Sequence, residues 1–379
     1  MAASRVLVGL DIGSSGVRAV QLRRLKDGSF EITHAAEADL PRGAVRNGGI
    51  HDSKAVVKAL RRLWKQGRFS TKRVAFGLAD AGVFTRQLDL PWMPPDDFRS
   101  ALRYQIGDSL PVDVSSLELD YHLLDRTEGT DDRGQPTPIN RVLIVAADQQ
   151  AVASEAQILR KAGLEPVVAD STALALIRVA CQGRLPQDGV TRALADIGAD
   201  QLTVVIHQDG QPRFIRTIAN IGGDAATEAV AARLDVELEA AETIKRVTGL
   251  NGPAPILAPV AESSVFSDSL VAEDVAADPR TAATIEVLSP WATSLVAEIR
   301  NSLDYYQAAP TSAPVESLTL VGRTVALGGM VGRVATQLPV PVHALDPTAG
   351  LALSKRVAKQ HPDDPRLAAA IGLAMAVAP

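Results

Sequence analysis

The chain has 379 residues, and at roughly 150 residues per domain this length predicts two or three folded units. Hydrophobic residues make up 46% and charged residues 22%, which is typical of a globular protein with a substantial core. The formal net charge of −5 argues against a protein whose main work is to neutralise nucleic-acid phosphates. The single cysteine, Cys181, excludes an internal disulfide, so we expect a reducing compartment.

The apolar runs near the two ends of the chain are short. The first, residues 6–10, stops at Asp11 and is too short for the core of a signal peptide. The last, residues 367–379, is also shorter than the roughly 20 residues that a spanning helix needs. We therefore expect no membrane-spanning segment, and membrane association only through partners.

Two stretches half a chain apart follow the same pattern. Asp11-Ile12-Gly13 and Asp196-Ile197-Gly198 each follow an apolar run, and each precedes alternating apolar residues and an Asp-Gly pair. Glycine tolerates positive φ, and Asp-Gly between apolar runs is typical of a β-hairpin. The repetition predicts a duplicated α/β unit that begins strand, turn, strand, turn, strand.

Each copy continues into helix and strand. Apolar residues at helical spacing predict a helix over residues 53–66, and an apolar run predicts a strand over 73–78. In the second copy the same pattern predicts helices over residues 223–233 and 237–248. A strand over 318–321 and a helix over 330–338 follow.

Two further blocks interrupt the repeat. Residues 84–166 predict three strands (84–90, 117–124 and 141–147), a helix after Pro94-Pro95 and a closing helix at 149–162. Within this block, the polar residues 128–138 predict a surface loop. The second block, roughly residues 234–310, is predicted to be largely helical, with a partly loop-like segment at 251–280.

Several common site motifs are absent from the sequence. There is no Gly-Lys dipeptide, which excludes a Walker-type phosphate loop, and no Gly-x-Gly, which excludes the Rossmann fingerprint. Neither Gly-x-Ser-x-Gly nor His-Glu-x-x-His occurs. The two Asp-x-Gly turns are therefore the main candidates for chemistry.

The first turn has residue types that suit a phosphate. The small residue Gly13 lets backbone N–H groups approach an anion, Ser14 and Ser15 add hydroxyl donors, and Arg18 can bind phosphate oxygens. Asp11 at a strand end could hold Mg²⁺. Either turn alone would be read as a plain hairpin, but the matched pair predicts two loops facing each other across a cleft.

Three later segments could complete such a cleft. Residues 222–224 end a strand and open a helix, so backbone donors would point outward there. Glu242 and Lys245 lie three apart on one helix face and could reach a nucleoside, or form only an exposed ion pair. Residues 322–324 follow a strand and could form the wall for a base or sugar, or be an ordinary loop.

This ordered set of motifs resembles the nucleotide site of the actin, Hsp70 and sugar-kinase superfamily. Within that superfamily the chain most resembles the PilM family of actin-like type IV pilus assembly proteins, which are similar to the division protein FtsA. The resemblance rests on residues 10–15 (Leu-Asp-Ile-Gly-Ser-Ser), 298–306 (Glu-Ile-Arg-Asn-Ser-Leu-Asp-Tyr-Tyr) and 370–374 (Ala-Ile-Gly-Leu-Ala), and on the position of the first inserted block. It covers essentially the whole chain.

The resemblance implies a duplicated actin-like (ribonuclease H-like) α/β fold, with two lobes around a nucleotide cleft and an FtsA-like insert. It implies four parts: a first core subdomain (1–86, 166–192 and 345–379), the insert (87–165), a second core subdomain (193–233 and 311–344) and a mainly helical subdomain (234–310).

The resemblance also implies ATP in the cleft, with Mg²⁺ near Asp11 and Asp196. The implied cofactor-binding residues are Asp11, Gly13, Ser14, Ser15, Arg18, Asp196, Gly198, Gly222, Gly223, Glu242, Lys245, Gly322 and Arg323. Two of them depart from the family pattern, because Arg18 stands where a lysine is usual and Arg323 interrupts a run of glycines. Arg323 could stack on adenine or occlude the pocket.

By the same resemblance, the protein is a cytoplasmic scaffold on the inner-membrane assembly platform. It would bind the cytoplasmic N-terminal tail of a PilN-like membrane protein in a groove beside the insert, with pilus motor ATPases and self-association as further open contacts. We expect no nucleic-acid partner. No residue stands out as a general base, so we expect at most a slow ATPase.

Two alternatives use the same fold. A sugar-type kinase would need a catalytic carboxylate, for which Asp170 and Asp89 are the candidates, and residues 170–172 are where relatives place a water-positioning group. An FtsA-like filament protein would typically end in an amphipathic membrane helix. The tail from Leu367 is Ala-rich with almost no polar face, so we expect it to pack in the core.

Overall fold

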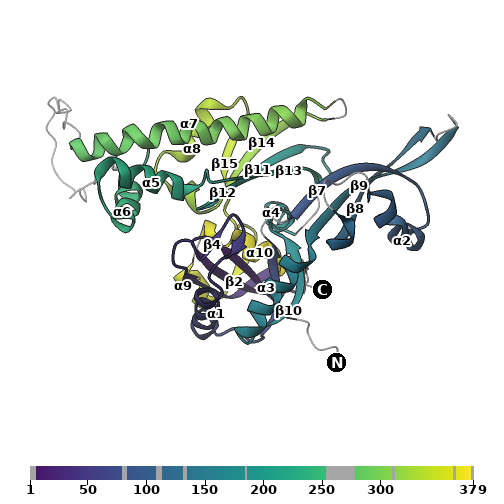
Figure 1. The fold of residues 1–379 in the computed structure, drawn as a ribbon, viewed down its shortest axis with the longest axis horizontal. Helices are drawn as coiled ribbons and strands as arrows, with labels where there is room; N and C mark the ends of the chain where they lie inside the picture. The colour runs from purple at the N-terminus through teal and green to yellow at the C-terminus, as the bar shows by residue number, and fades with distance from the viewer. Residues whose placement is uncertain are drawn as a thin grey trace.

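The computed structural model describes residues 6–78, 83–107, 113–130, 135–183, 186–252, 278–309, 312–361 and 364–376. Its two largest sheets form two lobes, with a smaller three-stranded sheet beside them (Figure 1). No helix in these ranges is long and apolar enough to cross a membrane.

The first sheet is built from a meander followed by parallel additions. In sheet order its strands are β10 (Glu165–Ser171), β6 (Arg73–Leu78), β1 (Val8–Gly13), β2 (Gly16–Arg24), β3 (Phe30–Asp39) and β16 (Ala352–Leu353). β1, β2 and β3 pair antiparallel, while β6 pairs parallel to β1 and β10 parallel to β6. The β1–β2 register places Asp11 opposite Arg18.

The second sheet repeats this plan. In sheet order its strands are β13 (Gln211–Ala219), β12 (Gln201–Gln208), β11 (Thr191–Ile197), β14 (Val315–Val321) and β15 (Val342–Ala344). β11, β12 and β13 pair antiparallel, and β14 and β15 are added in parallel. Asp196 lies opposite Thr203 as Asp11 lies opposite Arg18, which confirms the predicted duplication.

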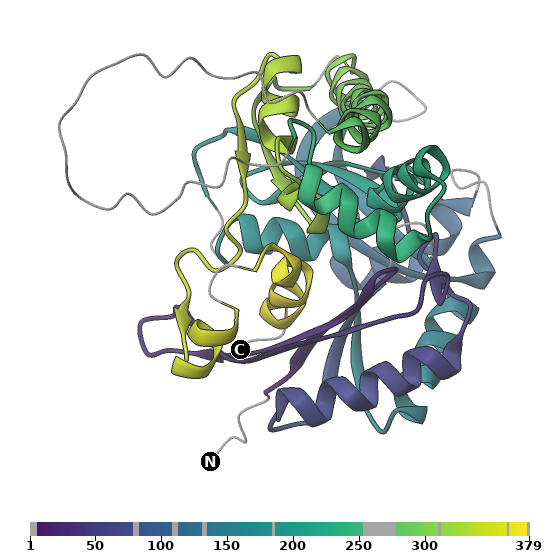
Figure 2. The ribbon, with the colours of Figure 1, turned by 90° about the vertical axis from the view of Figure 1, so that its left-hand side faces the viewer.

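Helices cover both lobes and fill the space between them. The helices are α1 (Ser53–Gly67), α3 (Gln149–Lys161), α4 (Thr172–Ala180), α5 (Gly223–Leu234), α6 (Leu238–Thr248), α7 (Pro279–Gln307), α8 (Met330–Gln337), α9 (Lys355–Gln360) and α10 (Ala368–Met375). α4 and α10 share one hydrophobic cluster with Leu194 and Val205 of the second sheet, so they lie between the two sheets. Figure 2 shows α1 along the outer edge of the first lobe, on the side opposite α7.

The tail packs as the sequence predicts. Every residue of α10 is buried. Its contact with α4 is close, because a Cβ added at Gly372 would lie 2.0 Å from the carbonyl oxygen of Ala175. A glycine at this position therefore sets how near the two central helices approach.

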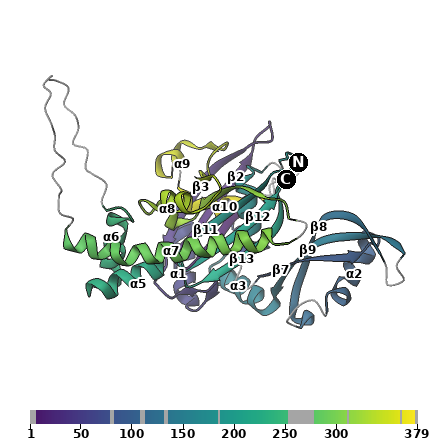
Figure 3. The same ribbon diagram turned by 90° about the horizontal axis from the view of Figure 1, so that it is seen from above.

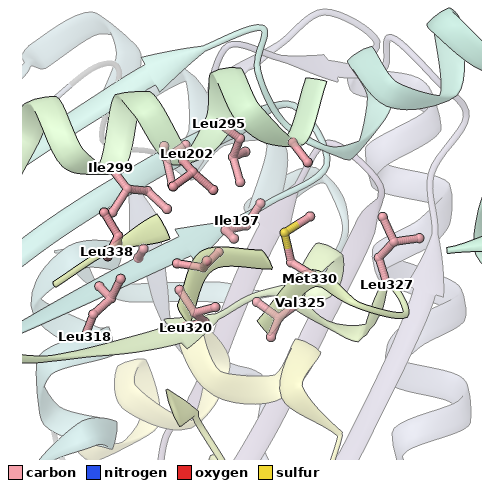
Figure 4. Packing of buried hydrophobic residues seen from close by; sticks show 14 of the residues in the cluster. Ile197, Leu202, Leu295, Ile299, Leu318, Leu320, Val325, Leu327, Met330 and Leu338 are labelled. Carbon is pink, nitrogen blue, oxygen red and sulfur yellow. The ribbon is translucent and has the colours of Figure 1, made fainter. Parts of the chain in front are cut away.

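The core of the second lobe forms between α7 and the second sheet. Leu295 and Ile299, one turn apart on α7, face Leu318 and Leu320, which alternate along β14 (Figure 4). All four side chains are fully buried. This cluster gives the second lobe a hydrophobic core of its own.

The predicted insert is a separate small sheet to one side of the lobes (Figure 3). It contains β7 (Val83–Pro91), β9 (Pro136–Asp148) and β8 (Leu117–Thr130), with α2 (Pro95–Gln105) packed on it. The prediction of a loop over residues 128–138 is wrong at both ends, because β8 and β9 pair as far as Thr130 and Pro136. The ladder continues there because the side chains still alternate between partly buried and exposed positions.

Short elements complete the chain. They are β4 (Val45–Arg46), β5 (Gly49–Ile50) and the 3₁₀ turns η3 (Val114–Ser116), η4 (Arg323–Ala326) and η5 (Pro365–Leu367). Most of the loop-like segment predicted at 251–280 lies outside the described residues. On α6, Val247 is 66% exposed whereas Lys245 is buried, so burial along this helix does not follow its apolar residues alone.

Candidate functional site

The two Asp-x-Gly turns face the same space between the lobes. A cavity of about 110 Å³ is lined by Asp11, Gly13, Ser14, Ser15, Arg18, Asp196, Gly198, Gly322 and Arg323, among others. It adjoins a larger cleft of about 1030 Å³ lined by Ser14, Ser15, Gly223, Glu242, Lys245 and Arg323, among others. Of the thirteen predicted residues, Gly222 alone lines neither space. The structure therefore brings together residues that lie up to 312 positions apart in the chain.

The first turn holds a buried ion pair. The carboxylate of Asp11 lies 3.3 Å from Nη1 of Arg18, and Nη2 of Arg18 donates to the hydroxyl of Ser15 at 2.9 Å. Arg18 is only 7% exposed, and its Nε has no partner in the part of the chain that the structure describes. Burial raises the pKa of Asp11 above its usual value even though Arg18 opposes the shift.

The second turn depends on a glycine from the neighbouring strand. Gly322 follows β14 with φ of +95°, in the left-handed region, and a Cβ there would lie 2.2 Å from Oδ1 of Asp196. The hydroxyl of Thr324 donates to the carbonyl of Gly198 at 2.8 Å. The loop after β14 therefore fixes both the carboxylate and the turn.

The start of α5 differs from the prediction of outward-pointing donors. The N–H of Gly223 donates to the carbonyl of Gly198 at 3.0 Å, and the N–H of Asp224 to that of Ala199 at 2.6 Å. A Cβ at Gly222 would lie 2.4 Å from the carbonyl oxygen of Ala199. The start of α5 thus holds the second turn, because the carbonyls of Gly198 and Ala199 occupy the N–H groups of Gly223 and Asp224.

Glu242 and Lys245 form a buried hub at the floor of the larger cleft. Nζ of Lys245 lies 2.6 Å from Oε2 of Glu242 and donates to Thr227 Oγ1 at 2.7 Å and to the carbonyl of Gly223 at 2.8 Å. Lys245 is 5% exposed, so the alternative of an exposed ion pair is wrong for it.

The hub shifts the titration of both of its charged members. Burial lowers the pKa of Lys245, with Glu242 opposing the shift. For Glu242, burial alone would raise the pKa, but Lys245, Thr227 and Arg323 together hold it below its usual value. The exposed part of Glu242 faces the cleft.

Arg323 lies where the two spaces join. Its Nη2 is 3.7 Å from Oε1 of Glu242, and its side chain is 29% exposed. The residue belongs to η4 and lines both the cavity and the cleft. This position leaves both predicted roles open, stacking on a base or narrowing the pocket.

Several residues that the sequence did not indicate also bound the cleft. Arg42 of the first lobe pairs with Asp224 of the second at 3.0 Å, and the N–H of Asn47 donates to the carboxylate of Asp200. At the opposite rim, Arg366 pairs with Glu37 at 2.9 Å and with Asp364 at 2.7 Å. Except for Asp364, each partner comes from a distant part of the chain, so no local motif could have shown these contacts.

The two carboxylates considered for a kinase are both engaged. Asp170 forms an ion pair with Arg178 of α4, whose guanidinium also donates to the carbonyl of Gly372. Asp89 lies on β7 of the insert and pairs with Arg141 at 2.9 Å. Neither residue lines the cavity or the cleft.

The donors at the cavity suit Mg²⁺ that is bound together with a phosphate. The described residues contain no group of three or more His, Cys, Asp or Glu side chains that could hold a metal by themselves. Mg²⁺ commonly uses one or two carboxylates together with waters and substrate phosphates. Asp11 and Asp196 line the same cavity and supply that kind of donor.

Comparison with known proteins agrees with this architecture. One structure, described as a PilM-PilN type IV pilus biogenesis complex, superposes with a TM-score of 0.78 at 23% identity and covers 98% of both chains. The ethanolamine utilization protein EutJ from Carboxydothermus hydrogenoformans superposes at 0.54, with 16% identity, 98% of this chain and 89% of that one. MreB5 of Spiroplasma citri bound to ADP gives 0.50, with 12% identity, 90% of this chain and 92% of that one.

These structural matches show the fold. The sequence itself matches a protein-family model over residues 9–266 and 277–378, which is nearly the whole chain. That model is described as type IV pilus assembly protein PilM. The chain therefore belongs to the PilM family of type IV pilus assembly proteins.

Proposed function

We propose that this protein is a nucleotide-binding scaffold of the type IV pilus inner-membrane assembly platform. The observation that carries the proposal is the pair of matched Asp-x-Gly turns facing one cavity, beside a cleft of about 1030 Å³. Pockets for small molecules and cofactors commonly span roughly 300–1,000 Å³. An MreB of the same fold was solved with ADP bound, which supports a nucleotide as the ligand.

ATP with Mg²⁺ fits the charged residues that line the cavity. Mg²⁺ at Asp11 and Asp196, and phosphate oxygens at Ser14, Ser15 and Arg18, would replace the ion pair that Asp11 and Arg18 now make with each other. Mg²⁺, when bound, would neutralise phosphate charge. Gly13 and Gly198 would leave room for the phosphates.

The larger cleft would take the nucleoside. The exposed oxygen of Glu242 would accept hydrogen bonds from ribose hydroxyls, and Arg323 would lie against the base. Lys245 would act through Glu242, because its own donors are taken up by protein groups. Gly222, Gly223 and Gly322 would shape the walls through the backbone.

ATP would act as a conformational ligand and not as fuel for rapid turnover. The two carboxylates that could serve a kinase are held in ion pairs away from the cleft, so we expect phosphate release to be slow or absent. A ligand that contacts both lobes binds more tightly when the lobes are closed than when they are open, so it shifts the population toward the closed arrangement.

We further propose the division into four parts given above, with the insert at 87–165 as the docking module. A solved relative of the same fold is described as a PilM-PilN complex, which supports a PilN-like membrane protein as partner. The partner's cytoplasmic N-terminal tail would occupy a groove beside the insert. This contact would hold the chain on the cytoplasmic face of the inner membrane.

Two assays test this function. Fluorescence anisotropy with a labelled peptide of the PilN-like tail should show saturable binding, while a scrambled peptide of the same composition should not bind. Phosphate release from Mg-ATP should be far slower than nucleotide exchange. Rapid turnover would instead favour an enzyme, and failure of the native peptide to bind would remove the scaffold role.

A further inference from the structure

One segment of the first lobe carries an unusual run of positive charge. Residues 53–79 contain eight lysines and arginines and no acidic residue, in a chain whose net charge is −5. Most of the run is helix α1, and the rest is the loop and strand that follow it.

The helical period places these cations on the side of α1 that faces away from the sheet. Val56, Leu60 and Leu63 are fully buried against the first lobe. The exposed cations, which we call the basic face, are Lys54, Lys58, Arg61, Arg62, Lys65, Arg68 and Lys72. In Figure 2, α1 lies at the outer edge of the molecule, away from α7.

Two other elements extend the basic face. Arg61 donates to the carbonyl of Lys161 at 2.7 Å, which brings the end of α3 alongside, and Arg356 of α9 donates to the carbonyl of Gln66 at 2.7 Å. Lys161 and Lys359 are exposed at the ends of these helices. The positive charge therefore spans three elements of one surface.

Acidic side chains do not neutralise the basic face. None of its seven cations lies within 4.0 Å of a carboxylate among the residues that the structure describes. Two neighbouring acids have other partners: Asp52 caps the N–H of Lys54, and Glu165 lies 3.8 Å from Arg73. Some exposed cations on other surfaces are paired, as Arg233 is with Glu286 at 2.9 Å.

Helix stability does not explain the pattern. The helix dipole favours cations near the C-terminus of a helix and disfavours them near the N-terminus. Lys54 lies in the first turn of α1, where a carboxylate would be preferred, and only Lys65 lies in the last turn, where the dipole favours a cation. The charge is thus spread along the whole exposed side of the helix at some expense to the helix itself.

We propose that the basic face docks on a membrane surface that contains anionic phospholipids. Clusters of four to eight lysines and arginines without acids have the chemistry that binds such surfaces. Most of these cations lie on the outward side of α1, and none of them lines the cavity or the cleft, which suits a broad planar surface. This proposal rests on the proposed function in one respect only, which is that the proposed function places the protein next to a membrane.

A nucleic acid is the less favoured partner. A helix that reads DNA enters the major groove, but α1 is packed along its length on the sheet, and Arg62 is tied to the carbonyl of Asp39 at 3.0 Å. The flexible lysines that make up more than half of the face act as point charges, which suits a fluid array of headgroups.

The test is co-sedimentation of the full chain with vesicles, without nucleotide or peptide. Wild-type protein should pellet with mixed phosphatidylcholine–phosphatidylglycerol vesicles at low salt, and not with pure phosphatidylcholine. Its binding should be lost at high salt. Replacing four cations (Lys54→Gln, Lys58→Gln, Lys65→Gln and Lys72→Gln) should weaken binding at least about tenfold. Glutamine keeps the helix propensity close to that of lysine.

A matched control separates the face from overall charge. Four exposed arginines elsewhere (Arg99→Gln, Arg233→Gln, Arg280→Gln and Arg300→Gln) change the net charge equally and should leave vesicle binding unchanged. The proposal is overturned if wild type stays in the supernatant, if both variants lose binding alike, or if only duplex DNA binds the face. Mg-ATP titration of the lysine variant reports separately on the proposed function, since none of the four lines the cleft.

Discussion

Gly322 is the residue on which the second carboxylate of the site depends. Replacing it with alanine forces a side chain into the left-handed backbone region at φ +95°, and puts its Cβ 2.2 Å from Oδ1 of Asp196. We expect Gly322→Ala to destabilise the fold by about 1–3 kcal/mol and to abolish Mg-ATP binding. Thermal unfolding and calorimetric titration measure the two effects.

Gly332 provides the matched control for that substitution. It lies within α8 and has open space where a Cβ would be placed. Gly332→Ala should therefore stabilise the protein by up to about 1 kcal/mol through helix propensity, with nucleotide binding intact. Equal loss in both variants would contradict the role given to Gly322.

We expect Lys245 to stabilise the fold as well as to position Glu242 in the cleft. Lys245→Met leaves the carboxylate of Glu242 and the carbonyl of Gly223 without their charged donor in a buried place. Breaking a buried pair in this way costs about 3–5 kcal/mol. Urea unfolding measures the loss, and the double variant Lys245→Met/Glu242→Leu should recover part of it. A loss below about 1 kcal/mol in the single variant would show that the hub is not a stabilising feature.

His207 predicts a pH dependence of stability. Burial on β12, together with Arg192 on the neighbouring strand, lowers the pKa of His207 to about 4 from an ordinary value of 6.5. Below about pH 6.5, His207 is protonated in the unfolded chain but stays neutral in the folded protein. The free energy of unfolding therefore falls as pH drops toward about 4.

His207→Gln removes this titration, so the stability difference between wild type and variant should narrow as pH falls. Urea unfolding at several pH values measures it, and replacement of the exposed His51 serves as control. A constant difference across this range would show that His207 does not titrate as described.

Among individual residues, Asp11 and Asp196 could be predicted from the sequence as site residues because each lies in a recognisable local turn. The burial of Lys245 could not be predicted, because its partners Gly223 and Thr227 lie on another helix. Nor could the contact of Arg42, which meets its partner from the other lobe.

At the scale of elements, the β4–β5 hairpin and the loop before it link the two lobes. Arg42 pairs with Asp224, and Asn47 contacts Asp200. Since Arg42 and Asp224 are each about one third exposed, solvent screens the pair, and we expect Arg42→Ala to cost less than about 1 kcal/mol of stability.

The same change should speed the release of a fluorescent nucleotide by several-fold, because it weakens the closed arrangement of the lobes. Stopped-flow displacement measures the rate. Asp224→Ala should have the same effect, and the double variant should add little to it. Additive effects of the two single variants would show that this pair does not hold the cleft.

Elements with strong local signals were predicted well. The helix at 53–66 and the strand at 73–78 match α1 and β6 closely. Asp52 caps the start of α1, and buried residues recur at helical spacing along it, while β6 is a short continuous buried run. The ends of β8 and β9 were missed, because cross-strand pairing there prevails over a polar composition.

For the whole molecule, the duplication was visible in the sequence because both copies keep the same turn chemistry. The two sheets repeat one strand order, with Asp11 and Asp196 at equivalent registers. The relative position of the lobes could not be predicted from the sequence, since it depends on contacts between residues far apart in the chain.

A calorimetric titration of the purified protein with Mg-ATP, continued past saturation, is the most direct test of the nucleotide cleft. We expect saturable binding without continuing heat. Asp196→Asn should abolish this binding, while Asp97→Asn on the exposed side of α2 should not affect it. Steady heat after saturation would indicate an enzyme, and the absence of binding by wild type would contradict the nucleotide cleft.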